Sequence, residues 1–212
     1  DTAMSSPYKA SYGASPSFSN FTVLPRGQRS LSVEELRVGL GGGGGGSGSG
    51  LAVRAHASCV IPAPLRDVWA ALRRFTWPAE LLSFVAVCEM LDGAAPTEVG
   101  GVREMRWKTG ERQRSRLLAL SDLEHSVSWE LEWSLAPAEA AAIVSEIKCL
   151  PVTEDDFTFV SWTTEFSADA SAELINQTTS GNQETLADIE RHFFERQRAA
   201  AGTSPPIAVP GR

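Results

Sequence analysis

The segment Ser126-Val-Ser-Trp-Glu-Leu-Glu-Trp133 alternates between polar and apolar side chains at every position. Successive side chains of a β-strand point to opposite faces of a sheet, so a period of two predicts a strand with one buried and one exposed face. An antiparallel sheet that covers a core on one side has this pattern. The side chains predicted to face inward are Val127, Trp129, Leu131 and Trp133.

Similar strand-forming runs precede and follow this segment, and short stretches of turn residues separate them. Asp92-Gly93, Thr109-Gly110 and Asp155-Asp156 are typical of tight connections between neighbouring strands. Connections this short join antiparallel neighbours, so the runs predict a meander. The segments expected to form strands are 52–61, 84–91, 99–108, 112–121, 126–133, 142–150 and 157–166.

Helical patterns lie at both ends of the strand-rich region. Pro64 suits the first turn of a helix that ends before Trp77-Pro78, and a short helix or turn then extends to about Leu82. Near the C-terminus, residues from about 180 to 200 carry apolar side chains at helical spacing. The inward-facing residues of this last helix are Leu186, Ile189 and Phe193.

This order of elements predicts an α+β helix-grip fold. We expect a curved seven-stranded antiparallel sheet wrapped on the long C-terminal helix, with two short helices after the first strand. A curved sheet under one helix leaves a cavity, and the domain would span residues 51–200. The glycine run 41–46 and its neighbouring serines make residues 1–50 a disordered tail or linker, and residues 201–212 form a second disordered tail.

Composition excludes several functional classes. The formal net charge is −7, and an acidic chain repels a phosphate backbone, so no nucleic-acid partner is expected. No apolar run is long enough to cross a bilayer, so membrane insertion is not expected. The 3 cysteines and 3 histidines are too widely spaced for a metal site, and no motif indicates a cofactor.

The N-terminal composition bears on localisation. An intracellular, cytoplasmic protein is the first expectation. The Ser-rich, acid-poor segment 1–50 also resembles an organelle transit peptide, so a plastid or another organelle is the alternative.

Five segments carry a family resemblance. Their order and spacing resemble the START-like (SRPBCC) helix-grip superfamily, in its polyketide cyclase/dehydrase and lipid-transport branch. The resemblance implies a ligand-binding domain, distantly similar to the abscisic acid receptors. The segments are Ile61-Pro-Ala-Pro-Leu-Arg-Asp-Val-Trp69, Phe84-Val-Ala-Val-Cys88, Val99-Gly-Gly-Val-Arg103, Arg116-Leu-Leu-Ala-Leu120 and Pro151-Val-Thr-Glu-Asp-Asp-Phe-Thr-Phe-Val-Ser-Trp162.

The sequence departs from its functional relatives at several positions. Ala86 stands where the receptors have a lysine that pairs with the ligand carboxylate, and residues 109–113 and 136–138 lack the receptors' gate and latch motifs. Hormone reception by that mechanism is therefore not expected. In the similar lachrymatory-factor synthases an arginine and a glutamate act, and Arg103 matches the first, but Ser115 stands in place of the second.

Strand alternation and the resemblance together predict which side chains line the cavity. Large aromatic residues among them suit a flat or lipidic guest. The residues predicted to bind the ligand are Arg103, Met105, Trp107, Ser115, Leu117, Trp129, Leu131, Trp162, Thr164, Leu186, Ile189 and Phe193.

Arg103 is the most informative of these residues. An inward guanidinium loses its hydration, which is costly without a hydrogen-bond acceptor. It pairs with an internal acid such as Glu146, or it orients an anionic or carbonyl group of the ligand. The sequence leaves both interpretations open.

Three functions fit this pattern. The first is binding or carriage of a small hydrophobic metabolite or lipid. The second is a polyketide cyclase/dehydratase-like reaction in which Arg103 polarises a carbonyl, and the third is a regulatory interaction domain of a longer protein. No acid/base pair falls on inward strand positions, so catalytic residues are unknown and binding is preferred to catalysis.

Overall fold

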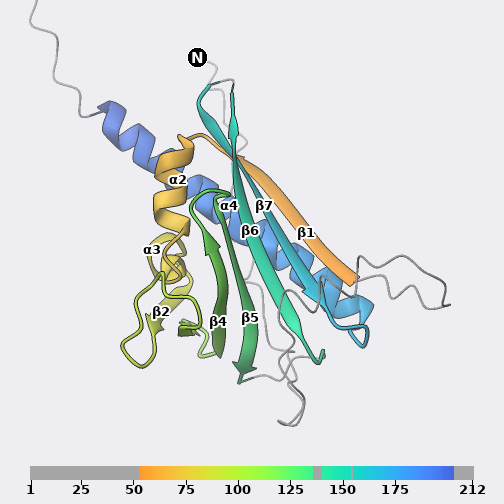
Figure 1. Cartoon of the computed structure of the whole chain (residues 1–212). Helices are drawn as coiled ribbons and strands as arrows, with labels where there is room; N and C mark the ends of the chain where they lie inside the picture. Colours follow the sequence, from red (N-terminus) through yellow and green to blue (C-terminus); the bar gives the residue numbers. More distant parts are fainter. Residues whose placement is uncertain (1–52, 136–139, 154, 203–212) are drawn as a thin grey trace, which may run out of the picture.

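The computed structural model describes residues 53–135, 140–153 and 155–202. The elements follow the predicted order: one strand, two short helices, six strands and a long helix (Figure 1). The strands are β1 (Val53–Ile61), β2 (Val85–Met90), β3 (Val102–Trp107), β4 (Arg112–Ser121), β5 (Ser126–Ser134), β6 (Ile143–Val152) and β7 (Phe157–Phe166). The helices are α2 (Leu65–Leu72), α3 (Trp77–Leu81) and α4 (Ala172–Gly202).

The strands form one antiparallel sheet in the order β1-β7-β6-β5-β4-β3-β2. Strands β2 to β7 form the predicted meander. Strand β1 is added at the edge beside β7, and the two pair from Val53 opposite Phe166 to Ile61 opposite Thr158. The helix α4, blue in Figure 1, crosses behind the sheet and packs along β1. The predicted α+β helix-grip fold is confirmed.

The helix α4 begins at Ala172 rather than at Ser180, so the sequence missed its first two turns. The Ser171 hydroxyl caps this start by accepting a hydrogen bond from the Leu174 backbone N–H at 3.1 Å. The missed turns contain Asn176, Thr178 and Thr179, and Ser180 and Gly181 follow them; these residue types are weak helix formers. Packing against the sheet therefore overrides local propensity in this part of the helix.

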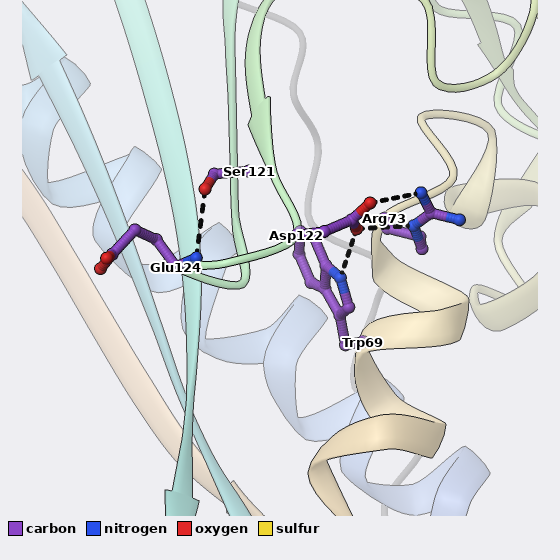
Figure 2. Close-up of polar contacts among 5 residues, drawn as sticks. All are labelled: Trp69, Arg73, Ser121, Asp122 and Glu124. Carbon is purple, nitrogen blue, oxygen red and sulfur yellow. Dashed lines mark hydrogen bonds and ion pairs between the residues drawn. The ribbon is translucent and has the colours of Figure 1, made fainter.

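A polar cluster fixes α2 to the turn between β4 and β5 (Figure 2). Asp122 Oδ1 accepts hydrogen bonds from Trp69 Nε1 at 2.8 Å and from Arg73 Nε at 3.0 Å, and Oδ2 accepts from Arg73 Nη2 at 2.8 Å. Within the turn, Ser121 Oγ accepts from the Glu124 backbone N–H at 3.1 Å. The bonds from Trp69 and Arg73 hold the pKa of Asp122 below its usual value.

The structure corrects the predicted orientation of Trp133. A β-bulge interrupts the pairing of β4 with β5, because Ser115 lies opposite Leu131 whereas Arg114 lies opposite Trp133. One extra residue reverses the alternation of a strand. Leu131 therefore lines the inner side, while Trp133 is 38% exposed and lies against Arg114, whose Cζ is 5.6 Å from the ring centroid.

Some expectations concern residues that the structure does not describe. The tail or transit peptide at 1–50 lies outside the described residues, and so does most of the C-terminal tail, although residues 201–202 belong to α4. Among the described helices, none combines the length and apolar character that crossing a membrane requires. In the same ranges, no three His, Cys, Asp or Glu side chains gather as metal ligands would.

Candidate ligand-binding cavity

A cavity of about 120 Å³ lies between the inner face of the sheet and the first half of α4. Its walls come from α3 and the segment after it, from β3 to β7, and from α4. An engineered cavity of about 150 Å³ in another protein takes up benzene. A space of this size therefore suits one ring with a small substituent.

Tryptophan rings form much of the wall. Trp77, Trp107, Trp129 and Trp162 all line the cavity. The Trp162 ring lies edge-to-face against two of the others, with centroids 6.0 Å from Trp77 and 5.6 Å from Trp129. Such contacts between aromatic rings are favourable and directional, so the rings form a defined apolar wall.

Arg103 places a buried positive charge in this wall. Its side chain is 2% exposed, and its Nη1 donates a hydrogen bond to the Phe75 carbonyl oxygen at 2.6 Å. The guanidinium Cζ also lies 4.0 Å from the Phe75 ring centroid and 5.2 Å from that of Trp129, within the range of cation–π attraction. Burial lowers the pKa of Arg103 to about 10, so the group remains protonated at neutral pH.

Glu146, the acid that the sequence analysis named as a possible partner of Arg103, lies on the outer face of the sheet. Ser145 lines the cavity, so the next residue on β6, Glu146, points outward. The same alternation on β3 sends Glu104 outward, where its two carboxylate oxygens accept from Arg112 Nη2 and Arg114 Nε. The interpretation of Arg103 as half of an internal ion pair with Glu146 is therefore wrong.

Four buried polar atoms of the cavity wall have no hydrogen-bond partner within the described ranges. They are Trp77 Nε1, Arg103 Nε, Ser115 Oγ and Trp162 Nε1. The three nitrogens can only donate, and the serine hydroxyl can donate or accept. Buried polar groups are paired in the large majority of cases, and an unpaired one costs about 1–3 kcal/mol. The wall thus concentrates unused hydrogen-bond donors.

A second polar group spans the cavity from the sheet to the helix. Thr164 Oγ1 on β7 accepts a hydrogen bond from Asn182 Nδ2 on α4 at 3.2 Å and lies 2.9 Å from Ser145 Oγ on β6. All three side chains are buried. These bonds fix the first half of α4 at a defined height above the sheet and so help to keep the space open.

The sequence model of the family described as polyketide cyclase / dehydrase and lipid transport matches residues 52–193. The chain belongs to this family. The match includes every strand and most of α4, and therefore every element that lines the cavity.

Solved structures share the fold of this family member. A protein from Nitrosospira multiformis is 28% identical and matches 68% of this chain and 99% of its own, with a TM-score of 0.61. An uncharacterised protein from Bacillus thuringiensis is 22% identical, with coverages of 66% and 98% and a TM-score of 0.58. XoxI from Bacillus cereus is 19% identical, with coverages of 68% and 98% and a TM-score of 0.59. The Bacillus structures support the fold alone.

The structure brings together most of the residues that the sequence predicted for ligand binding in this polyketide cyclase family member. The remaining four, Leu117, Leu186, Ile189 and Phe193, do not line the cavity but pack in the close core beside it, each at most 3% exposed. On α4 the cavity is lined by residues between 178 and 185, whereas Leu186, Ile189 and Phe193 come after this stretch and pack in the core cluster. The predicted residues that line the cavity are Arg103, Met105, Trp107, Ser115, Trp129, Leu131, Trp162 and Thr164.

Several lining residues were not predicted. Those on α4 recur at helical spacing, but one of them precedes the predicted helix start at about residue 180, and the others are small or polar residues that a search for apolar periodicity does not select. Those around α3 depend on how this short helix packs on the sheet, and no sequence pattern indicates that. The lining residues that the sequence analysis missed are Trp77, Pro78, Leu82, Phe84, Gln113, Ile143, Ser145, Thr178, Gly181, Asn182 and Thr185.

Proposed function

We propose that this protein binds and carries a small hydrophobic molecule in the cavity between the sheet and α4. The observation that carries the proposal is a cavity of about 120 Å³ with four tryptophans in its wall. A concave apolar site with a few polar groups is the usual form of a small-molecule site. Membership in a family of cyclases, dehydrases and lipid-transport proteins supports the same conclusion.

The side chains of the wall favour binding over catalysis. Within the described part of the chain, Arg103 is the only ionisable side chain that lines the cavity. Proton transfer to and from a substrate needs a group whose pKa lies near the working pH, and the pKa of Arg103 is about 10. Arg103 could still polarise a carbonyl, so a cyclase or dehydratase-like reaction is the alternative.

Uptake of toluene tests the proposal. A ligand of seven carbon atoms gains at most about 1.5 kcal/mol per atom, or about 10 kcal/mol in all, so titrations should extend from nanomolar to millimolar concentrations. The four tryptophans of the wall make intrinsic fluorescence a direct readout, and calorimetry provides an independent one. We expect saturable binding with one site per chain. Failure of toluene and similar single-ring probes to bind would overturn the proposal.

A cavity-filling variant and a matched control show whether toluene binds in this cavity. Thr178 lines the cavity from α4, whereas its neighbour Gln177 is exposed on the same helix. Thr178→Phe should weaken toluene binding tenfold or more, and Gln177→Phe should leave it unchanged. Far-ultraviolet circular dichroism confirms that both variants are folded. Equal effects of the two substitutions would place the bound probe elsewhere.

A further inference from the structure

We propose that the natural ligand of the cavity is a single-ring molecule with a carboxylate, and that Arg103, Ser115 and the indole N–H of Trp77 bind this carboxylate. The inference rests on the proposed function, because it specifies the chemical class of the molecule that the cavity holds. Three features of the site support it: the charge of Arg103, the chemistry of the unpaired atoms around it, and the size of the space.

The charge of Arg103 is not balanced within the described part of the chain. This guanidinium is 2% exposed and forms no salt bridge there. Its partners are the Phe75 carbonyl oxygen and the faces of aromatic rings, which carry no net charge. The nearby Cys88 thiol does not balance the charge either, because burial raises the pKa of this thiol and keeps it neutral. A buried charge is stable only when it is paired, so an anionic ligand is the complement that this site lacks.

The carboxylate next to Arg103 on its own strand is already used elsewhere. Glu104 lies next to Arg103 in the chain but points to the outer face, where Arg112 and Arg114 hold it. The residue directly opposite Arg103 on β4 is Ser115, whose small side chain carries no charge. The residue opposite Arg103 on β2 is Met90, so neither neighbouring strand places a carboxylate opposite Arg103.

The side chains that carry the unpaired atoms come from different elements and are successive neighbours along the wall, from Ser115 and Arg103 to Trp77 and then Trp162. Residues directly opposite across an antiparallel pair have Cβ atoms about 4.5–5.5 Å apart, which places Ser115 beside Arg103. The Cζ of Arg103 is 6.0 Å from the Trp77 ring centroid, and the Trp162 ring is 6.0 Å from that of Trp77. These four residues hold the unpaired Nε, Oγ and Nε1 atoms of the wall.

These atoms match the chemistry of a carboxylate. Two indole N–H groups and a guanidinium N–H can only donate, so the ligand atom that they bind must be an acceptor. A carboxylate offers two oxygens with about four acceptor positions, and arginine binds this group by short, charge-assisted hydrogen bonds. A neutral carbonyl accepts fewer bonds and leaves the charge of Arg103 unbalanced. The volume of about 120 Å³ then leaves room for one ring, which the indoles of Trp129 and Trp162 would contact.

Three probes of similar shape separate this inference from the proposed function. Benzoate has a ring and a carboxylate, benzamide has a neutral carbonyl, and toluene has neither. We expect the wild-type protein to bind benzoate at least tenfold more tightly than benzamide, and benzamide more tightly than toluene. If toluene binds and benzoate binds no more tightly, the inference is overturned while the proposed function stands. If no probe binds, the proposed function itself fails.

Three variants test the role of the named residues. Arg103→Met keeps the length of the side chain and removes its charge, so benzoate affinity should fall at least tenfold while toluene affinity changes less than threefold. Arg106→Met is the matched control, because Arg106 is exposed on the same strand and should leave all three affinities unchanged. Ser115→Asp places an acid opposite Arg103, so it should exclude benzoate and retain toluene. The last variant supplies a counter-charge, which keeps the test decisive if Arg103→Met does not fold. Unchanged benzoate affinity in Arg103→Met or in Ser115→Asp overturns the inference.

Discussion

Truncation of Trp129 to alanine tests whether this side chain forms the wall of a cavity or part of a solid core. The residue is 5% exposed, lines the cavity, and has its ring 6.0 Å from Phe75 and 5.6 Å from Trp162. In a close-packed core such a truncation costs about 3–5 kcal/mol, because the lost transfer free energy adds to about 24 cal/mol for each Å³ of new void.

At Trp129 the void contribution should be small. The space that the indole vacates joins a cavity whose wall already contains the polar groups of Arg103 and Ser115, so water can enter and bind there. What remains is the transfer free energy of one aromatic side chain, about 1.5–3 kcal/mol. For a domain of this size the thermal midpoint should fall by about 3–12 °C.

Urea denaturation of Trp129→Ala and Phe166→Ala compares the loss of free energy of unfolding at a cavity wall with that in the packed core. Phe166 is the benchmark, since it is 4% exposed and packs against Ala55 and Leu174 without lining the cavity. Phe166→Ala should lose about 3–5 kcal/mol, and Trp129→Ala should lose less although its side chain is larger. Trp129→Ala should also take up naphthalene, which the wild-type cavity is too small to hold. If Trp129→Ala loses as much free energy of unfolding as Phe166→Ala, or more, and takes up no naphthalene, this outcome refutes the reasoning. The space between the sheet and α4 would then be a core filled by side chains.

Other predictions concern the outer face of the sheet and the helices. Glu104→Gln should lower the free energy of unfolding at pH 7 by about 1–2 kcal/mol, a value discounted because the two partner arginines are 43% and 47% exposed. Hydrogen bonds from those arginines lower the folded-state pKa of Glu104. The contribution of Glu104 to the free energy of unfolding is therefore present above about pH 4.3 and is lost as the pH falls through the folded-state pKa. A stability difference between Glu104→Gln and wild type that persists in acid denaturation curves contradicts this. Asp122→Asn should lower the thermal midpoint, because it weakens the hydrogen bonds from Trp69 and Arg73 that attach α2. Toluene affinity should stay unchanged, because Asp122 does not line the cavity. An altered affinity would show that these hydrogen bonds affect the shape of the cavity. Ile189→Asp should lower the free energy of unfolding by several kcal/mol, because Ile189 is 0% exposed. Glu190→Asp, on the exposed side of α4, should leave the free energy of unfolding nearly unchanged in the same urea denaturation assay. Equal losses in the two variants would contradict the orientation of the helix.

The sequence by itself determined the order and type of the elements. The period of two along Ser126–Trp133 and the turn residues between the strands are local signals, because backbone geometry fixes which side chains share a face. The same parity argument placed Trp129 and Trp162 on the inner face, and the family resemblance placed Arg103 there; the structure has all three in the cavity wall. The inward position of Arg103 indicated that its guanidinium would be desolvated, which its exposure of 2% bears out.

Only the tertiary structure decided where the cavity lies and what surrounds Arg103. The β-bulge that turns Trp133 outward depends on how two strands pair, and the early start of α4 depends on packing that overrides weak helix formers. The attachment of Glu104 to two arginines, and the absence of an acid beside Arg103 among the described residues, follow from the register of β3 with β4. Register and helix position arise from contacts between residues far apart in the chain, and local periodicity carries no information about such contacts.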